Sequence, residues 1–104
     1  VDMDAVITAM QAAGVDGAIT CGPEGAVIVH AGEAVRVDAV SVQGVMDLTG
    51  AGDQFAAGYL CGVARGHTAR ACGRMGALAA AEVIQHFGPR PEKDLRAVFA
   101  EYDL

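Results

Sequence analysis

The chain of 104 residues is 53% hydrophobic and has 14 glycines and no tryptophan, which fits one small globular domain. Seven basic and 13 acidic side chains give a net charge of −6, the wrong sign for a protein that binds nucleic acid or an anionic membrane. No apolar run reaches the roughly 18 residues that span a bilayer. Any anion that the protein binds must therefore be held by local groups.

The cysteines and the first residues bear on the location and extent of the protein. Three cysteines without a C-x-x-C pair indicate neither a disulfide framework nor a zinc site, so a reducing, cytoplasmic location is expected. The opening residues, VDMD, resemble neither a signal peptide nor a natural start. We therefore expect the chain to be a piece of a longer protein.

The first half of the chain predicts one helix followed by a small sheet. Apolar residues recur at helical spacing from Val6 to Ala13, Asp2 or Asp4 can cap the helix, and Gly14 can end it. Glycine-containing turns then separate apolar or alternating segments. These segments predict three strands, at residues 18–21, 26–29 and 34–40.

The second half predicts three helices. The first opens at Gly50 and is closed by Gly66, the second is capped by Thr68 and runs to about Phe87, and the third has Pro91 near its first position. The order α-β-β-β-α-α-α predicts an α/β or α+β layer protein. The residues expected on the apolar faces are Phe55, Ala56, Tyr59, Leu60 and Val63 in the first of these helices, and Leu95, Val98, Phe99 and Tyr102 in the last.

The segment DLTGAGD, residues 47–53, carries the strongest chemical signal. It places small residues at the first turn of a helix, where backbone N–H groups lack helical partners and the helix dipole is positive. Such a helix start binds a phosphate or another oxyanion, and Asp53 beside it is placed to accept a proton from an attacking hydroxyl. A base next to an anion hole indicates phosphoryl transfer.

A simpler interpretation of the same segment is that Asp53 only caps a helix whose glycines form a tight turn. The segment is not a Walker A loop, because no G-K-[ST] follows. It is not a dinucleotide fingerprint either, since Phe55 stands three residues after Gly52. Both of these nucleotide-binding classes are disfavoured.

The longer pattern D-x-T-G-A-G-D-x-x-x-A-G-Y-L, residues 47–60, resembles the C-terminal signature of the ribokinase family, the PfkB-type carbohydrate kinases. Upstream, residues 20–25 (TCGPEG) are similar to the T-x-G-x-x-G turn of that family, and residues 88–91 (GPRP) to its G-A-x-P segment. The resemblance implies an α/β fold, the C-terminal portion of a ribokinase-like three-layer αβα sandwich. The resemblance covers only the last third of such an enzyme, so the N-terminal sheet, the lid and the sugar-binding part are expected to be absent from these 104 residues.

The resemblance also implies roles for individual residues in an ATP-dependent kinase. Asp53 would be the catalytic base, and Gly50, Ala51 and Gly52 the anion hole for the transferring γ-phosphoryl group. Thr20, Gly22 and Gly25 would border ATP. The helical segment 77–84 would lie near the adenine, and Gly76 and Ala80 of this helix would contribute to the nucleotide site. Magnesium would bridge the phosphates mostly through water.

Further ligands and partners are implied more loosely. A monovalent cation such as K⁺ would use Asp47 and Thr49, with carbonyls around Val83, His86 and Gly88. Leu48 departs from the small polar or β-branched residue usual in the family. The acceptor would be a small-molecule sugar or nucleoside, with the adenosine kinase-like branch suggested by residues 80–84 (AAEVI) and GPRP. A homodimer is an expectation for the full-length enzyme.

Two other hypotheses stay open beside the kinase. The chain is a truncated or degenerate, non-catalytic part of such an enzyme, or it is an unrelated module that binds an anion at residues 50–53. Arg65, Arg70 and Arg74 form a basic cluster, for which a solvated face is preferred over a nucleotide phosphate contact. Cys61 and Cys72 are interpreted as small buried packing residues.

Overall fold

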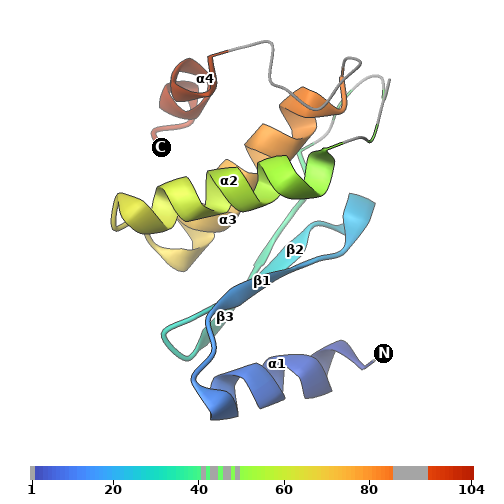
Figure 1. Cartoon of the computed structure of the whole chain (residues 1–104), viewed down its shortest axis with the longest axis vertical. Helices are drawn as coiled ribbons and strands as arrows, with labels where there is room; N and C mark the ends of the chain where they lie inside the picture. The colour runs from blue at the N-terminus through green and yellow to red at the C-terminus, as the bar shows by residue number, and fades with distance from the viewer. Residues whose placement is uncertain (1, 41, 43–44, 46–47, 49, 86–93) are drawn as a thin grey trace.

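The computed structural model describes residues 2–40, 42, 45, 48, 50–85 and 94–104. The chain forms an elongated body of 39 × 30 × 18 Å in which α1 and α4 lie at opposite ends (Figure 1). The predicted order of helices and strands is confirmed. The elements are α1 (Met3–Ala13), β1 (Gly17–Thr20), the 3₁₀ turn η1 (Gly22–Glu24), β2 (Ala26–His30), β3 (Glu33–Val37), α2 (Ala51–Ala64), α3 (Ala69–Val83) and α4 (Leu95–Glu101).

The three strands form an antiparallel meander in the order β1-β2-β3. In the central strand, Ile28 pairs with Ala18 on one side and Val35 on the other. The first four residues of β2 are all buried, which explains their continuous apolar run. The third strand ends at Val37 rather than at residue 40, so Ala39 and Val40 leave the sheet.

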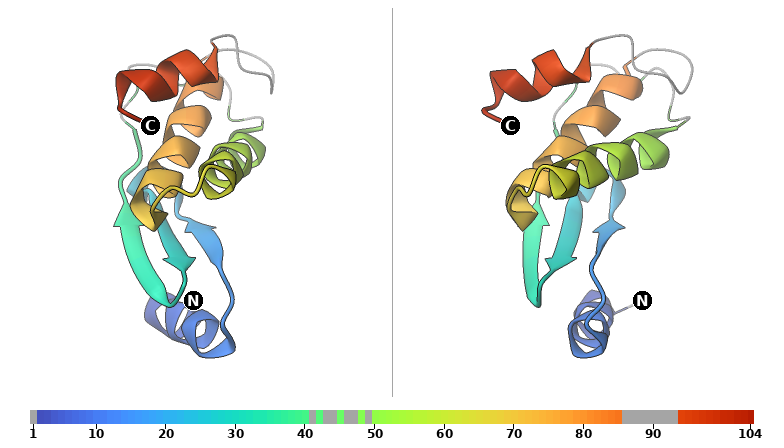
Figure 2. Two further views of the ribbon diagram at one scale, coloured as in Figure 1. Left: turned by 90° about the vertical axis from the view of Figure 1, so that its left-hand side faces the viewer. Right: turned by 60° about the vertical axis from the view of Figure 1, so that its left-hand side comes forward.

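Helix α1 begins and ends at the predicted residues. The Asp2 side chain accepts hydrogen bonds from the Asp4 and Ala5 amides at 3.0 and 3.4 Å, and Gly14 ends the helix in the left-handed conformation, at φ 68°. The helix contacts β2, at the end of the sheet away from α2 and α3 (Figure 2). No residue of α1 is fully buried, so this helix lies at the margin of the core.

Helices α2 and α3 pack closely because glycines lie between them. A Cβ atom built on Gly58 would lie 2.5 Å from the Met75 carbonyl oxygen, and one on Gly76 would lie 2.9 Å from the Phe55 oxygen. The predicted apolar face of α2 is therefore partly wrong, since Leu60 is 59% exposed and Val63 is 39% exposed. The buried face consists of Phe55, Gly58, Tyr59 and Gly62.

Helix α3 lies on the sheet and forms the centre of the core. Gly73 faces Ile28 and Val37, and an added Cβ would lie 2.6 Å from the Val37 side chain. Met75 is fully buried, and Cys72 is 2% exposed. Burial raises the pKa of the Cys72 thiol above its ordinary value, so this side chain is a neutral packing group, as predicted.

The helix predicted to reach Phe87 ends earlier, at Val83. Two carbonyl groups of its last turn accept hydrogen bonds from Gln85. The Gln85 backbone amide donates to the Glu82 carbonyl oxygen at 3.3 Å, and the Gln85 side chain donates to the Ala81 carbonyl oxygen at 2.8 Å. Residues 86–93, with Phe87, Pro91 and the GPRP segment, lie outside the described residues.

Helix α4 begins after Asp94, whose side chain accepts from the Arg96 amide at 3.0 Å. Phe99 is buried against Met75 and Leu78 of α3, and Leu95 and Val98 are partly buried beside it. Tyr102, which was predicted on the same apolar face, is 44% exposed. Its ring instead lies beside the Arg74 guanidinium, 5.9 Å from the ring centre. None of the helices in the described ranges is long and apolar enough to cross a membrane.

Removing the α3 cap should lower the stability of the fold measurably. The Thr68 hydroxyl accepts a hydrogen bond from the Ala71 amide at 3.2 Å, as the sequence predicts. We expect Thr68→Ala to reduce the free energy of unfolding by about 1 kcal/mol, measured by urea denaturation. Thr8→Ala, an exposed position inside α1, is the matched control, and an equal loss in both variants would contradict the capping role.

Candidate active site

The start of α2 is shaped by a glycine in the left-handed conformation. Gly50 is the N-cap residue at φ 81°, a backbone state that glycine adopts without strain. Its carbonyl accepts the Gln54 amide at 2.9 Å, and the Ala51 amide bonds Leu48 O at 3.2 Å. Among the described residues, no backbone carbonyl accepts from the amides of Gly52 and Asp53. These two amides lie at the positive end of the helix dipole, where an oxyanion is stabilised.

Asp53 is the acidic residue in the first turn of α2. Its side chain is exposed and makes no ion pair with a described residue. The carboxylate is thus accessible to a ligand that approaches the helix start.

The second predicted segment, residues 20–25, forms a tight turn between β1 and β2. The Cys21 amide donates to Gly25 O at 2.7 Å, and the Gly25 amide donates to Gly22 O at 3.1 Å. Both glycines have positive φ, 57° at Gly22 and 94° at Gly25. A Cβ at Gly25 would also collide with the Val37 carbonyl oxygen. Glycine is therefore required at position 25 by conformation and by space.

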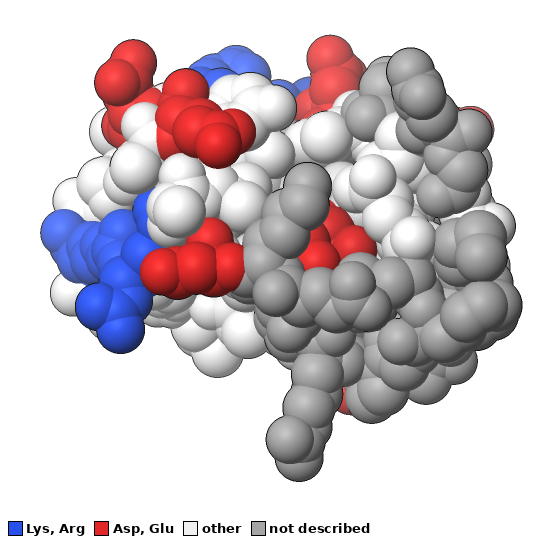
Figure 3. Space-filling model, turned by 90° about the horizontal axis from the view of Figure 1, so that it is seen from above, with Lys and Arg blue, Asp and Glu red and all other residues white. Residues whose placement is uncertain are grey.

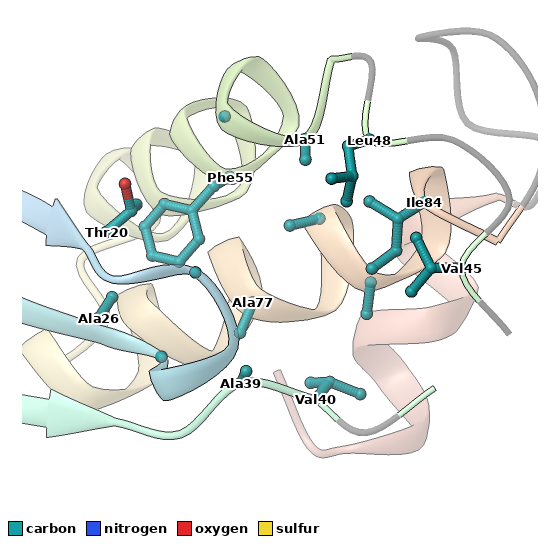
Figure 4. Close-up of a pocket in the computed structure, with 15 residues that line it drawn as sticks. Thr20, Ala26, Ala39, Val40, Val45, Leu48, Ala51, Phe55, Ala77 and Ile84 are labelled. Carbon is teal, nitrogen blue, oxygen red and sulfur yellow. The ribbon is translucent and has the colours of Figure 1, made fainter. Parts of the chain in front are cut away.

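A pocket of about 380 Å³ lies between this turn, the start of α2 and the last turns of α3 (Figure 4). Figure 4 shows Phe55 and Thr20 at one end, and Leu48, Val45 and Ile84 gathered at the other. Within the described ranges, Thr20 contributes the one lining side chain with a polar atom. The described lining residues are Thr20, Gly22, Gly25, Ala26, Ala39, Val40, Val45, Leu48, Ala51, Gly52, Phe55, Ala77, Ala80, Ala81 and Ile84. An apolar pocket that opens onto helix amides suits a ligand with a flat apolar part and an anionic part.

Most of the predicted site residues meet at this pocket, although they come from three separate segments. Gly50 and Asp53 flank its lining at the helix start. Gly76 does not line it and packs instead against Phe55. Asp47, Thr49, His86 and Gly88 lie outside the described residues. The predicted residues that line the pocket are Thr20, Gly22, Gly25, Ala51, Gly52 and Ala80.

Sequence reasoning missed several lining residues. Phe55 was predicted only as a core residue, and Ala39 and Val40 were predicted in a strand. Phe55 is 8% exposed, so burial against α3 and contact with the pocket use the same side chain. A large apolar residue two positions after Asp53 was the available signal for it.

Charge is mixed on the described part of one face of the molecule. Seen from above, acidic and basic side chains lie beside one another rather than in separate fields (Figure 3). Among the described residues no group of three or more His, Cys, Asp or Glu side chains comes together as metal ligands. The described lining residues carry no charged side chain, so among them the backbone amides of α2 are the groups suited to an anion.

Comparison with known proteins gives a consistent result. Residues 2–95 match the pfkB family of carbohydrate kinases. An uncharacterized sugar kinase from Archaeoglobus fulgidus is 42% identical over 73 residues, which is 70% of this chain and 29% of that protein.

Solved structures agree with this match. A probable sugar kinase from Rhizobium etli superposes with a TM-score of 0.90 and 37% identity, over 98% of this chain and 31% of that one. The adenosine kinase of Sinorhizobium meliloti gives a TM-score of 0.89 and 38% identity, over 97% and 31%. The chain thus spans less than a third of the length of these relatives. The predicted fold class, an α/β portion of a ribokinase-like fold, is confirmed.

Two similar structures hold ligands that the family resemblance implied. The ribokinase of Arabidopsis thaliana is complexed with ribose and ATP. It is 25% identical and superposes with a TM-score of 0.80, over 93% of this chain and 32% of that one. The phosphofructokinase-2 of Escherichia coli is in complex with potassium. It shares the fold at 20% identity and a TM-score of 0.79, over 100% of this chain and 36% of that one.

Proposed function

Because the chain belongs to the pfkB family of carbohydrate kinases, we propose that it takes part in the transfer of the γ-phosphoryl group of ATP to a hydroxyl of a sugar or nucleoside. In this proposal residues 1–104 supply the nucleotide-binding and catalytic part. The residues that select the acceptor would lie mostly in the upstream part of such an enzyme, and the chain spans less than a third of the relatives' length. The observation that carries the proposal is the pocket that joins the residue 20–25 turn to the start of α2.

We propose that the adenine occupies the apolar part of the pocket, between the Gly22–Gly25 turn and Ala80 of α3. A purine ring is flat and largely apolar, and the small side chains on α3 let it approach the helix closely. The phosphates would then extend toward Gly52. The ATP bound to the ribokinase of Arabidopsis thaliana supports this choice of nucleotide.

The amides of Gly52 and Asp53 would hold the transferring phosphoryl group. They belong to the first turn of α2, and amides whose orientation a helix sets in advance would stabilise negative charge with little reorganisation during the reaction. The Asp53 carboxylate would take the proton of the acceptor hydroxyl as its oxygen attacks phosphorus. Asp53 fits this role because it is exposed at the same helix turn.

Magnesium would arrive with the nucleotide, as part of its substrate complex. The described residues offer no acidic cluster that could form a protein cage, and Mg²⁺ is commonly held by substrate phosphates and water. The ion would supply charge neutralisation on the phosphates. A potassium site that uses Asp47 and Thr49 remains a proposal, and its residues lie outside the described ranges.

Calorimetric titration of the chain with ATP in the presence of Mg²⁺ tests the nucleotide site. We expect saturable binding that ADP displaces and inorganic phosphate does not. Transfer itself is tested in the complete gene product, by ADP release with ribose, fructose, adenosine and inosine as acceptors. ATP binding without turnover on any acceptor would favour a non-catalytic relative, and the absence of ATP binding would overturn the assignment of the pocket.

A Gly52→Ala substitution should weaken ATP binding while leaving the fold stable. Gly52 lines the pocket, and a Cβ built on it meets no atom within 4 Å, so the fold has room for the methyl group. We expect an unfolding free energy within about 1 kcal/mol of the wild type and ATP affinity about tenfold weaker, because phosphate can no longer approach the backbone closely. Unchanged ATP affinity would contradict a phosphate position at Gly52.

A further inference from the structure

A second pocket, of about 230 Å³, lies between the end of β3, helix α3 and the end of α4. It adjoins the nucleotide pocket, because Val40 and Ala77 line both. Its chemistry differs, since Arg70, Arg74 and Asp38 also line it. The proposed phosphoryl transfer makes no use of these charged groups.

The two arginines lie one helical turn apart on α3, and both line this pocket. Arg70 donates from Nη1 to the Arg36 carbonyl oxygen at 3.2 Å, and the Arg74 guanidinium lies 5.9 Å from the centre of the Tyr102 ring. Both arginines are exposed, and neither of these contacts neutralises their charge. In the part of the chain that the structure describes, neither guanidinium forms an ion pair with a carboxylate.

Two neighbouring guanidinium groups without a carboxylate partner among the described residues, in a chain of net charge −6, favour an anionic ligand with several acceptor oxygens. A phosphate monoester fits because each guanidinium can donate two parallel hydrogen bonds to its oxygens. The Asp38 carboxylate would repel a second anionic group and accepts hydrogen bonds from a hydroxyl. Val37, Leu78 and the Tyr102 ring supply an apolar wall for a carbon skeleton.

We propose that this second pocket binds a hydroxylated phosphate monoester of the sugar phosphate class, with its phosphate on Arg70 and Arg74 and a hydroxyl on Asp38. The proposal does not depend on catalysis by the chain. It assigns the phosphate to side chains of α3, whereas the nucleotide proposal assigns phosphate to the amides of α2.

Titration of the 104-residue chain with ribose 5-phosphate tests the site, with ribose and inorganic phosphate as comparison ligands. We expect saturable binding of ribose 5-phosphate, at least about tenfold tighter than that of inorganic phosphate, and no binding of ribose. Arg74→Gln should weaken ribose 5-phosphate at least about tenfold. Arg65→Gln is the matched control and should leave binding unchanged, because Arg65 is exposed at the end of α2 and does not line the pocket.

Three further readouts distinguish this site from the nucleotide pocket and from loss of folding. Arg70→Lys keeps the charge but removes the paired donors, so we expect weaker ribose 5-phosphate binding with an unchanged unfolding midpoint. Asp38→Ala should bring the affinities for ribose 5-phosphate and inorganic phosphate closer together. ATP should not displace ribose 5-phosphate. Competitive displacement by ATP, or equal binding by the Arg74→Gln and Arg65→Gln variants, would overturn the proposal.

Discussion

An Asp53→Asn variant is expected to lose about 10²- to 10⁴-fold in kcat, the usual contribution of a positioned general base. The amide keeps the size of the carboxylate, but it cannot accept the proton of an attacking hydroxyl. ATP affinity should be retained or slightly improved, because the substitution removes a negative charge beside the site of the transferring phosphoryl group. The measurement is steady-state ADP release by the complete gene product, with calorimetric ATP binding measured in parallel.

Asp4→Asn provides a matched control for this experiment. Asp4, like Asp53, is the acidic residue in the first turn of its helix, so each substitution removes a similar interaction with a helix dipole. No residue of α1 lines the pocket, and the helix lies at the end of the sheet away from α2 (Figure 2). The activity of Asp4→Asn should therefore match that of the wild type. An Asp53→Asn enzyme with a near wild-type rate would remove Asp53 from the role of base and would leave it as a residue of the helix start.

Local signals in the sequence predicted much of the fold because they are short-range. The Asp2 and Thr68 caps and the left-handed Gly14 satisfy backbone groups within three or four residues, so their positions can be recognised without tertiary contacts. The sheet order likewise follows from short turns between consecutive strands. These features set the predicted order of helices and strands.

The buried face of α2 could not be predicted in the same way. A search for large apolar residues at helical spacing selects Leu60 and Val63, both of which are exposed. The actual contact with α3 uses Gly58 and Gly62, and a glycine has no side chain for such a pattern to detect. The packing becomes visible only when two helix backbones approach closely.

In the pocket too, residues marked by local motifs could be predicted, whereas residues placed there by tertiary packing could not. Motifs selected Thr20, Gly25 and Gly52, because turns and helix starts have recognisable residues. The roles of Val40 and Phe55 depend on which segments fold against one another. The turn after β1 and the first turn of α2 are distant in sequence, and their meeting at one pocket is a property of the whole fold.

The glycine contact between α2 and α3 leads to the largest expected loss of stability. A Cβ on Gly58 would lie 2.5 Å from the Met75 oxygen, 2.8 Å from the Met75 carbonyl carbon and 2.9 Å from the Gly76 Cα. All three are backbone atoms, so no change of rotamer relieves the clash and the helices must move apart. We expect Gly58→Ala to lower the free energy of unfolding by about 1–3 kcal/mol, measured by urea denaturation of the chain.

Gly52→Ala is the matched control for Gly58→Ala, because it adds the same methyl group to the same helix at a position with nothing within 4 Å. The gain in helix propensity on replacing glycine by alanine is larger at Gly58, in the helix interior, than at Gly52 in the first turn. A lower stability of Gly58→Ala than of Gly52→Ala therefore reports the clash with α3. Because α2 carries Gly52 and Asp53, movement of the helix should also weaken ATP binding by Gly58→Ala under conditions where it is still folded. Equal unfolding midpoints for the two variants would show that α2 and α3 can separate at no cost, and that this packing does not position the site.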